Sequence, residues 1–151
     1  MDNYEALSKP VARCISKLSN QIRRRIDALA SKDEFSGAQG RVLHFILSQP
    51  EKLFQRDVEE EFGLRPPTAT EILKKMEQNG LIRREPTAYD ARLKQIIVSE
   101  KAMQYQKPVM DGLMQLEEDL TEGISKEELA VFQQVVEKMT ENMARAGIQQ
   151  P

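Results

Sequence analysis

Two stretches of this sequence carry side chains whose types and spacing suit contact with a polyanion. The first is a helical segment with a polar face made of Pro67, Thr68, Thr70, Glu71, Lys74 and Lys75. The second is the polar run Pro86–Arg92, in which Asp90 stands two residues before Arg92, and Lys94 follows it. Hydroxyl and ammonium groups on a helix can reach phosphates and base edges in the major groove of DNA. An arginine on a hairpin tip can enter the minor groove, where the negative potential is strongest. These residues predict contact with double-stranded DNA.

The helix that must hold the first group is readable from its apolar spacing. Ala69, Ile72, Leu73 and Met76 recur three or four residues apart, so Pro66–Asn79 is predicted to be a helix that docks by this stripe. Pro66 and Pro67 fit the first turn of a helix, where a missing N–H costs nothing. Gly80 ends the helix. The polar face is thereby left toward solvent.

The second group requires a hairpin. Leu81–Glu85 and Lys94–Ser99 are predicted strands, the second rich in β-branched residues. The tip between them is longer than a tight turn needs, which favours a functional role for it. A short helix, Gln55–Phe62, precedes the polar helix and ends at Gly63, which suits a left-handed C′ position. The order short helix, helix, strand, tip, strand predicts a winged helix-turn-helix.

Four further helices are predicted around this unit. Their ranges are Leu7–Ala30 with Ser8 as N-cap, Ser36–Ser48 capped by Ser36, Lys101–Leu120 with a bend or break at Pro108, and Lys126–Met143 with a capping box of Ser125 and Glu128. The predicted fold class is therefore mainly α with a small β-hairpin wing. Residues 35–100 form the winged helix-turn-helix, and residues 1–34 and 101–151 form a helical dimerisation region within one compact chain.

The dimerisation region is predicted from a surplus of apolar positions. The first helix and the last two carry more apolar residues than a compact winged helix needs for its own core. A homodimer interface is the simplest use for them. Two-fold symmetry would then match a pseudo-palindromic operator with half-sites about one helical turn apart.

The run GLIRREPTAYDAR, Gly80–Arg92, resembles the wing of the MarR-type transcription regulators. It keeps the glycine, the apolar pair, the arginine, the proline and the Asp-x-Arg at that family's spacing. Upstream, LRPPTATEILKKMEQNG resembles the family's recognition helix, and downstream VSEKA resembles the junction after the wing. The resemblance runs from about Phe35 to Ala102 residue by residue, and beyond that in helix order and length.

The resemblance implies a sequence-specific transcription regulator, a repressor released by a small-molecule effector or a stress signal. It implies that Arg92 enters the minor groove and that Asp90 holds the tip through an ion pair. Pro67, Thr68, Thr70 and Lys75 fall where the family's DNA-facing residues lie. The family often has arginine where Glu71 stands, and a carboxylate there would either repel phosphate or accept from a cytosine amine.

Two residues are candidates for effector or redox sensing. His44, the only histidine, lies in the apolar run Val42–Leu47 and is predicted to be a core or pocket-wall residue. Cys14 lies in the first helix, where some MarR-type proteins sense peroxides. Its apolar neighbours favour a buried, inert thiol, and thiol oxidation is the alternative sensing mode.

Composition sets the broad class. The chain has 151 residues, a formal net charge of -2 and one cysteine, which excludes an internal disulfide and fits a reducing cytosol. No apolar run approaches the ~20 residues that span a bilayer, and the N-terminus lacks a secretory signal, so we expect a cytoplasmic protein without membrane contact. Arg65–Lys94 carries seven basic and four acidic residues, which gives a locally positive field. No metal-ligand or nucleophile–base spacing appears, so neither a cofactor, a metal nor an enzymatic activity is expected.

Other interpretations stay open at this point. The polar helix face could be an ordinary solvated surface, and Asp90 with Arg92 a surface ion pair. Arg23–Arg25 beside Lys17 could bind phosphate, although a solvated face is the simpler interpretation. The alternative function is a protein–protein adaptor that reuses the winged helix without DNA, which the net acidity and Glu71 would suit.

Overall fold

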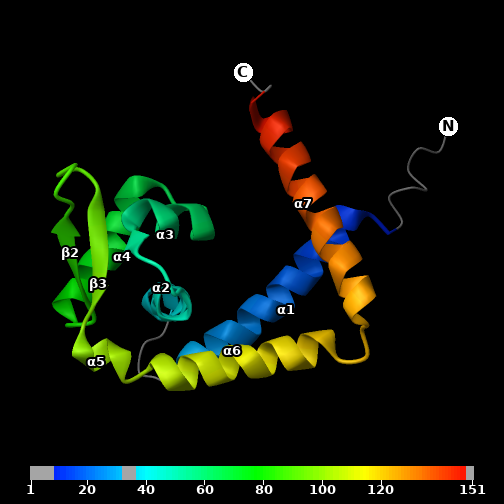
Figure 1. Ribbon diagram of the computed structural model, residues 1–151, viewed down its shortest axis with the longest axis horizontal. Coiled ribbons are helices and arrows are strands. Elements are labelled where there is room, and N and C mark those ends of the chain that lie inside the picture. The colour runs from blue at the N-terminus through cyan, green and yellow to red at the C-terminus, as the bar shows by residue number, and fades with distance from the viewer. Residues whose placement is uncertain (1–8, 32–36, 149–151) are drawn as a thin grey trace. The chain divides into compact units, whose positions relative to one another are not determined.

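The structure is a computed structural model that describes residues 9–31 and 37–148 (Figure 1). Contacts divide the chain into two compact units, Met1–Leu116 and Glu117–Pro151. The division falls within helix α6 (Gln106–Thr121), so each unit is considered by itself. Among the described residues, no helix is both long enough and apolar enough to cross a membrane.

The first unit begins with two helices, α1 (Val11–Ser31) and α2 (Gly37–Ser48). Helix α1 begins at Val11, later than the predicted start at Leu7, and Lys9 and Pro10 precede it. The carbonyl of Pro10 accepts the N–H groups of Arg13 at 3.1 Å and Cys14 at 3.2 Å, so the proline lies just before the helix and not within its first turn. The proposed caps Ser8 and Ser36 lie outside the described residues. The α2 helix is more apolar than α1, and six of its twelve residues are buried.

The helix-turn-helix consists of α3 (Gln55–Phe62) and α4 (Pro66–Gln78), as predicted. The backbone N–H of Phe54 donates to Asp57 Oδ2 at 2.8 Å, which caps the start of α3. Gly63 ends that helix with φ 59°, a left-handed conformation that a side chain would strain. This turn sets the angle at which the chain enters α4.

A three-stranded antiparallel sheet in the order β1-β3-β2 completes the winged helix. Strands β2 (Ile82–Pro86) and β3 (Lys94–Val98) form the predicted hairpin, in register from Ile82 opposite Val98 to Pro86 opposite Lys94. Strand β1 (Leu53–Phe54), which pairs with β3, was not predicted. Two residues are too few to display an alternating pattern, so this strand has no signal in the sequence.

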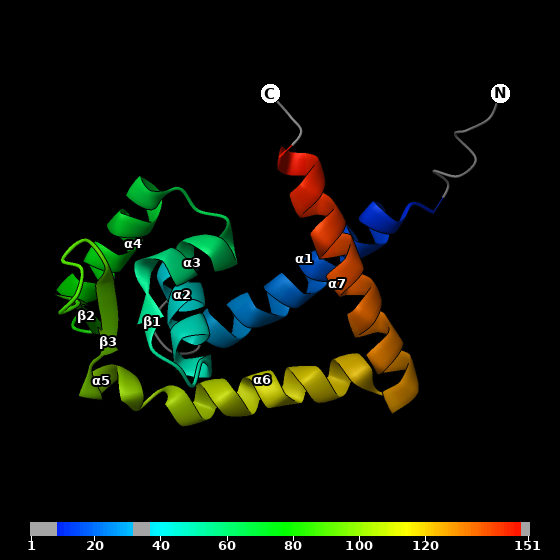
Figure 2. The same ribbon diagram turned by 45° about the horizontal axis from the view of Figure 1, so that its top comes forward.

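One core joins the helix-turn-helix to the wing. Its buried members are Val42, Leu43, Ile46, Leu47, Val58, Leu73, Met76, Leu81, Ile82, Ile96, Ala102 and Val109. They come from α2, α3, α4, both hairpin strands and the helices that follow. Figures 1 and 2 show the hairpin at one end of this unit, beside α4 and apart from α1. Helix α4 and the wing are therefore fixed to the same packed interior.

The predicted helix Lys101–Leu120 is interrupted, as expected, but not at the predicted residue. The structure has a short helix α5 (Glu100–Met103) followed by α6, with the break at Gln104 and Tyr105 instead of at Pro108. In a continuous helix the proline ring would collide with the carbonyl four residues earlier, that of Gln104. The break at that point places Pro108 in the first turn of α6, where a proline is tolerated.

The second unit contains α7 (Lys126–Ile148), which extends beyond the predicted end at Met143. Ser125 caps it as predicted, since its Oγ accepts the N–H of Glu128 at 3.1 Å. The Ser125 hydroxyl also donates to Glu128 Oε1 at 3.2 Å, whereas in a capping box that carboxylate accepts the backbone N–H of the cap residue. The helix leaves large apolar side chains exposed within this chain: Val131, Phe132, Val135, Val136 and Met143. The use of the flanking helices for dimerisation stays a prediction.

Candidate nucleic-acid interface

Helix α4 is anchored by one face. Ala69, Leu73 and Met76 are fully buried, and Ile72 packs against the core, so the predicted apolar stripe is confirmed. The helix starts without a side-chain cap: Arg65 at the N-cap has extended backbone and makes no such hydrogen bond. Proline at the first two positions reduces the number of N–H groups that need a partner.

The opposite face of α4 is open to solvent. Pro67, Thr68, Glu71, Lys74 and Lys75 are all exposed, as their spacing predicts. Thr70 differs, because its side chain is half-buried and its hydroxyl is already engaged. It donates to the Pro66 carbonyl at 2.9 Å and accepts from Gln55 Nε2 at 2.9 Å. The exposed face thus carries the two cations Lys74 and Lys75, the Glu71 carboxylate and the Thr68 hydroxyl over about three turns of helix.

The tip of the wing is held by hydrogen bonds of its own. The Thr87 hydroxyl donates to the Asp90 carbonyl at 2.6 Å and accepts the Asp90 N–H at 3.1 Å. The N–H of Thr87 donates to the Leu93 carbonyl, and that of Leu93 to the Asp90 carbonyl, both at 3.1 Å. These bonds close residues 87–93 into an ordered turn.

Asp90 also orders the end of the tip. Its Oδ1 accepts the backbone N–H of Arg92 at 2.9 Å and lies 3.6 Å from Arg92 Nε. The ion pair implied by the family resemblance is therefore present. The Arg92 side chain itself is 96% exposed and projects a cation from the tip. Lys94, exposed at the start of β3, stands beside the base of the same turn.

A half-buried arginine, Arg84 on β2, was not singled out in the sequence. Only 13% of its side chain is exposed, and it makes hydrogen bonds to the carboxylate of Glu77 and to Gln55 Oε1. These partners lie 7 and 29 residues away along the chain. Polar residues that meet only in the folded chain leave no periodic pattern, so sequence reasoning had no signal with which to find them.

His44 lies where the sequence predicts, at 4% exposure in the middle of α2. It lines an open cavity of about 660 Å³ between α1, α2, the helix-turn-helix and α6. Apolar side chains such as Ile22, Ile26 and Phe62 make part of the wall, and Arg23 and Arg41 add positive charge to it. Arg23 thus lines the cavity. Arg41 Nη1 lies 3.3 Å from Asp27 Oδ1, so this arginine forms an ion pair.

Cys14 corrects an expectation. The thiol was predicted to be buried among apolar neighbours, yet it is exposed in this chain. Val11, Ile15 and Leu18 are exposed as well, at 56%, 47% and 39%. The N-terminal half of the apolar stripe on α1 is therefore not covered by other described residues of this chain. No group of three or more His, Cys, Asp or Glu side chains suited to a metal ion occurs among the described residues.

Known proteins resemble this chain in the sequence of the helix-turn-helix and wing and in overall fold. Residues 34–93, which include the helix-turn-helix and the tip of the wing, match the MarR family. The solved transcription regulator MarR from Oenococcus oeni PSU-1 is 27% identical, with a TM-score of 0.72 over 87% of this chain and 99% of that chain. The transcriptional regulator PA3341 is 26% identical, with a TM-score of 0.81 over 90% of this chain and 99% of that one.

A third structure, the S. aureus MepR–DNA complex, is 21% identical, with a TM-score of 0.72 over 88% of this chain and 98% of that chain. At this identity the likeness concerns the fold. Residues 34–93 match the MarR family, and the chain is similar in its winged-helix fold to solved MarR-type transcription regulators.

Proposed function

We propose that this protein is a sequence-specific DNA-binding transcription regulator that works in the cytoplasm and has no catalytic role. The observation that carries the proposal is the pairing of two exposed cationic surfaces on one core. One is the α4 face with Lys74 and Lys75, and the other is the wing tip with Arg92. A helix fits the major groove, and an arginine on a hairpin fits the adjacent minor groove. A relative of the same fold, MepR, has been solved in complex with DNA.

The test is selection of bound duplexes from random DNA, followed by comparison of the selected duplex with a scrambled one at the same salt concentration. We expect the selected duplex to bind about 1,000-fold more tightly or better, as specific sites do over non-specific DNA. Equal affinities that depend only on salt would reject sequence-specific regulation. Absence of any DNA binding at low salt would favour the protein–protein adaptor instead.

The regulator is proposed to act as a homodimer on a pseudo-palindromic operator. Support comes from apolar side chains that stay exposed on α1 and α7 in the single chain, among them Ile15, Phe132 and Met143. Exposed large apolar side chains that gather on one helix are typical of interaction sites. Selected sequences should then contain two inverted half-sites about one helical turn apart. A single half-site bound by a monomer would contradict this assembly.

Release from DNA is proposed to follow binding of a small molecule in the His44 cavity, and the protein is proposed to repress transcription while it is bound to DNA. The cavity has the size and the mixed apolar and polar wall of ligand sites in proteins. Its wall includes Ile72 of α4, so an occupant that prefers one placement of α4 would shift DNA affinity. An Ile22→Trp change, which fills the cavity from α1, should leave DNA binding intact and abolish the response to such a ligand.

Oxidation of Cys14 is the alternative signal, and exposure of the thiol favours it. The two signals should be abolished by different substitutions. Cys14→Ser should remove an oxidant response and leave a ligand response unchanged, whereas Ile22→Trp should do the reverse. Measurement of operator affinity with and without peroxide in both variants separates the two.

A further inference from the structure

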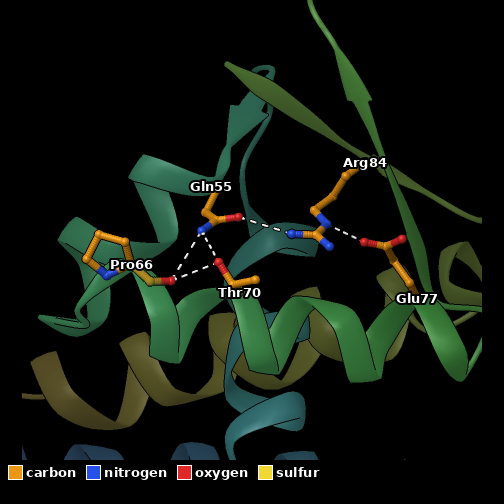
Figure 3. Close-up of polar contacts among 5 residues, drawn as sticks. All are labelled: Gln55, Pro66, Thr70, Glu77 and Arg84. Atoms are coloured by element: carbon orange, nitrogen blue, oxygen red, sulfur yellow. Dashed lines mark hydrogen bonds and ion pairs between the residues drawn. The ribbon is translucent and has the colours of Figure 1, made fainter. Parts of the chain in front are cut away.

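Five polar groups join α3, α4 and β2 in one connected set, which we call the Gln55 network (Figure 3). Its members are Gln55, the Pro66 carbonyl, Thr70, Glu77 and Arg84. Arg84 donates through Nε to Glu77 and through Nη1 to Gln55 Oε1 at 3.2 Å. A guanidinium can only donate, so the Gln55 amide must turn its oxygen toward Arg84.

With its oxygen toward Arg84, the Gln55 amide directs its NH₂ group toward the start of α4. Gln55 Nε2 donates to Thr70 Oγ1 at 2.9 Å and lies 3.4 Å from the Pro66 carbonyl oxygen. The Thr70 hydroxyl in turn donates to the same carbonyl at 2.9 Å. A reversed amide would place its NH₂ against the guanidinium and its oxygen against a carbonyl. The network therefore has one consistent direction of donation, from Arg84 and Gln55 into the first turn of α4.

This attachment occurs where α4 has no cap of its own. Arg65 makes no side-chain cap, and the prolines at the first two positions present no N–H group. The first turn is instead tied by Gln55 to the start of α3, and through Arg84 to the wing. The exposed residues that flank this turn are Pro67, Thr68 and Glu71. A change in the placement of the turn would move all three relative to the wing tip.

We infer that Gln55 is a positioning residue for DNA reading: anchored by Arg84, it fixes the first turn of α4 relative to the wing. The inference rests on the proposed function, because it assigns DNA reading to this face of α4. Gln55 acts through Thr70 and the Pro66 carbonyl and needs no contact with the nucleic acid. Its loss should therefore reduce discrimination between sequences more than it reduces attraction to phosphate.

The test uses Gln55→Met, which keeps the length and the charge of the side chain and removes both hydrogen-bonding ends. Gln104→Met, at an exposed glutamine between α5 and α6, is the matched control. We expect Gln55→Met to bind the selected operator about tenfold more weakly, the equivalent of one lost well-placed interaction. Affinity for a scrambled duplex should stay within about twofold, and the salt dependence should not change, since no cation is removed. Equal losses on both duplexes would overturn the inference.

A double variant separates positioning from direct contact. Thr70→Val removes the same attachment from the α4 side, so Gln55→Met and Thr70→Val together should lose less affinity than the sum of their separate losses. Strict additivity would mean that Gln55 touches DNA itself, which contradicts the inference. Thr70→Val also keeps the test decisive if Gln55→Met folds poorly, because it should lower discrimination by itself.

A measurement without DNA keeps this inference separate from the proposed function. Amide hydrogen exchange at Ala69, whose N–H bonds to the Arg65 carbonyl at 3.1 Å, should accelerate in Gln55→Met and in Arg84→Met. Exchange at Ile96 in β3 should stay the same. Unchanged exchange at Ala69 would refute the positioning role even if operator binding is specific. If wild-type protein shows no sequence preference, the proposed function fails, and the exchange result still decides whether Gln55 holds the turn.

Discussion

Asp90 holds Arg92 through two contacts, one to its backbone N–H at 2.9 Å and one to its guanidinium Nε at 3.6 Å. With Arg92 96% exposed, an ion pair of this kind contributes about 0–1 kcal/mol to stability. Its main effect is on direction, because it restrains the base of a long side chain whose end stays in solvent. The tip is thus arranged to present a cation more than to stabilise the fold.

Arg92→Ala should weaken operator binding by about 1–3 kcal/mol if the guanidinium reads a groove. The physical reason is loss of a cation from the narrow minor groove, where the potential is most negative. Titration of labelled operator by fluorescence anisotropy measures the change. Lys107→Ala, which removes an exposed cation from α6, is the control and should leave affinity unchanged. An Arg92→Ala protein with wild-type affinity would remove the wing from the proposed interface.

Asp90 variants should separate its two contacts. Asp90→Asn keeps an oxygen that can accept the Arg92 N–H but loses the charge, whereas Asp90→Ala loses both. Because the backbone bond orders the tip, we expect operator affinity to fall more in Asp90→Ala than in Asp90→Asn. Both should bind better than Arg92→Ala, which lacks the cation itself. An Asp90→Ala protein that binds as wild type would show that the tip needs no such restraint.

Glu71 and Lys75 occupy the same exposed face but should give different phenotypes. Lys75→Ala should weaken all duplexes similarly and reduce the slope of log affinity against log salt by about 1, the signature of a phosphate contact. Glu71→Gln should instead change which base is preferred at one operator position, because a carboxylate accepts from cytosine. Repeating the selection with each variant distinguishes them. An unaltered selected sequence for Glu71→Gln would mean that the carboxylate does not read a base.

Much of the fold could be predicted because it repeats a simple pattern along the chain. The stripe Ala69, Leu73 and Met76 has helical spacing, and the structure buries all three. Gly63 marks the turn before α4, because glycine adopts the left-handed conformation there without the strain that a side chain would bring. The paired strands of the wing follow from their β-branched residues. Residues close together in the sequence determine each of these elements, so the sequence pattern was sufficient to predict them.

The features that were predicted wrongly or missed are less well determined by the local sequence. The start of α6 depends on a collision between Pro108 and a carbonyl four residues earlier, and the sequence shows the proline without showing which side of it the helix breaks. The Gln55 network joins residues from three elements, so no window of sequence contains it. Exposure of Cys14 depends on what covers α1, which the pattern of α1 alone does not specify. The last two misses concern contacts between elements.

Leu73 provides a direct measure of how firmly α4 is seated. The side chain is fully buried between the helix and the core that also carries the wing. Leu73→Ala should lower the free energy of unfolding by about 2–5 kcal/mol, the loss from a cavity at such a site. Urea denaturation followed by circular dichroism gives the value. Lys74→Ala, next to it on the exposed face, is the control and should change stability by less than about 0.5 kcal/mol.

Phe132 on α7 tests the proposed homodimer. Its ring is 55% exposed in the single chain, and Val135 and Val136 beside it are also exposed. A glutamate at position 132 would bury charge in an apolar interface, so Phe132→Glu should shift the protein from dimer to monomer. Gln134→Glu adds the same charge elsewhere on α7 and should stay dimeric. Light scattering after size exclusion gives the masses, and circular dichroism checks that both variants remain helical. Because a two-fold operator needs both subunits, the monomer should also bind a palindromic duplex no better than a single half-site. A dimeric Phe132→Glu protein would place the interface away from this face of α7.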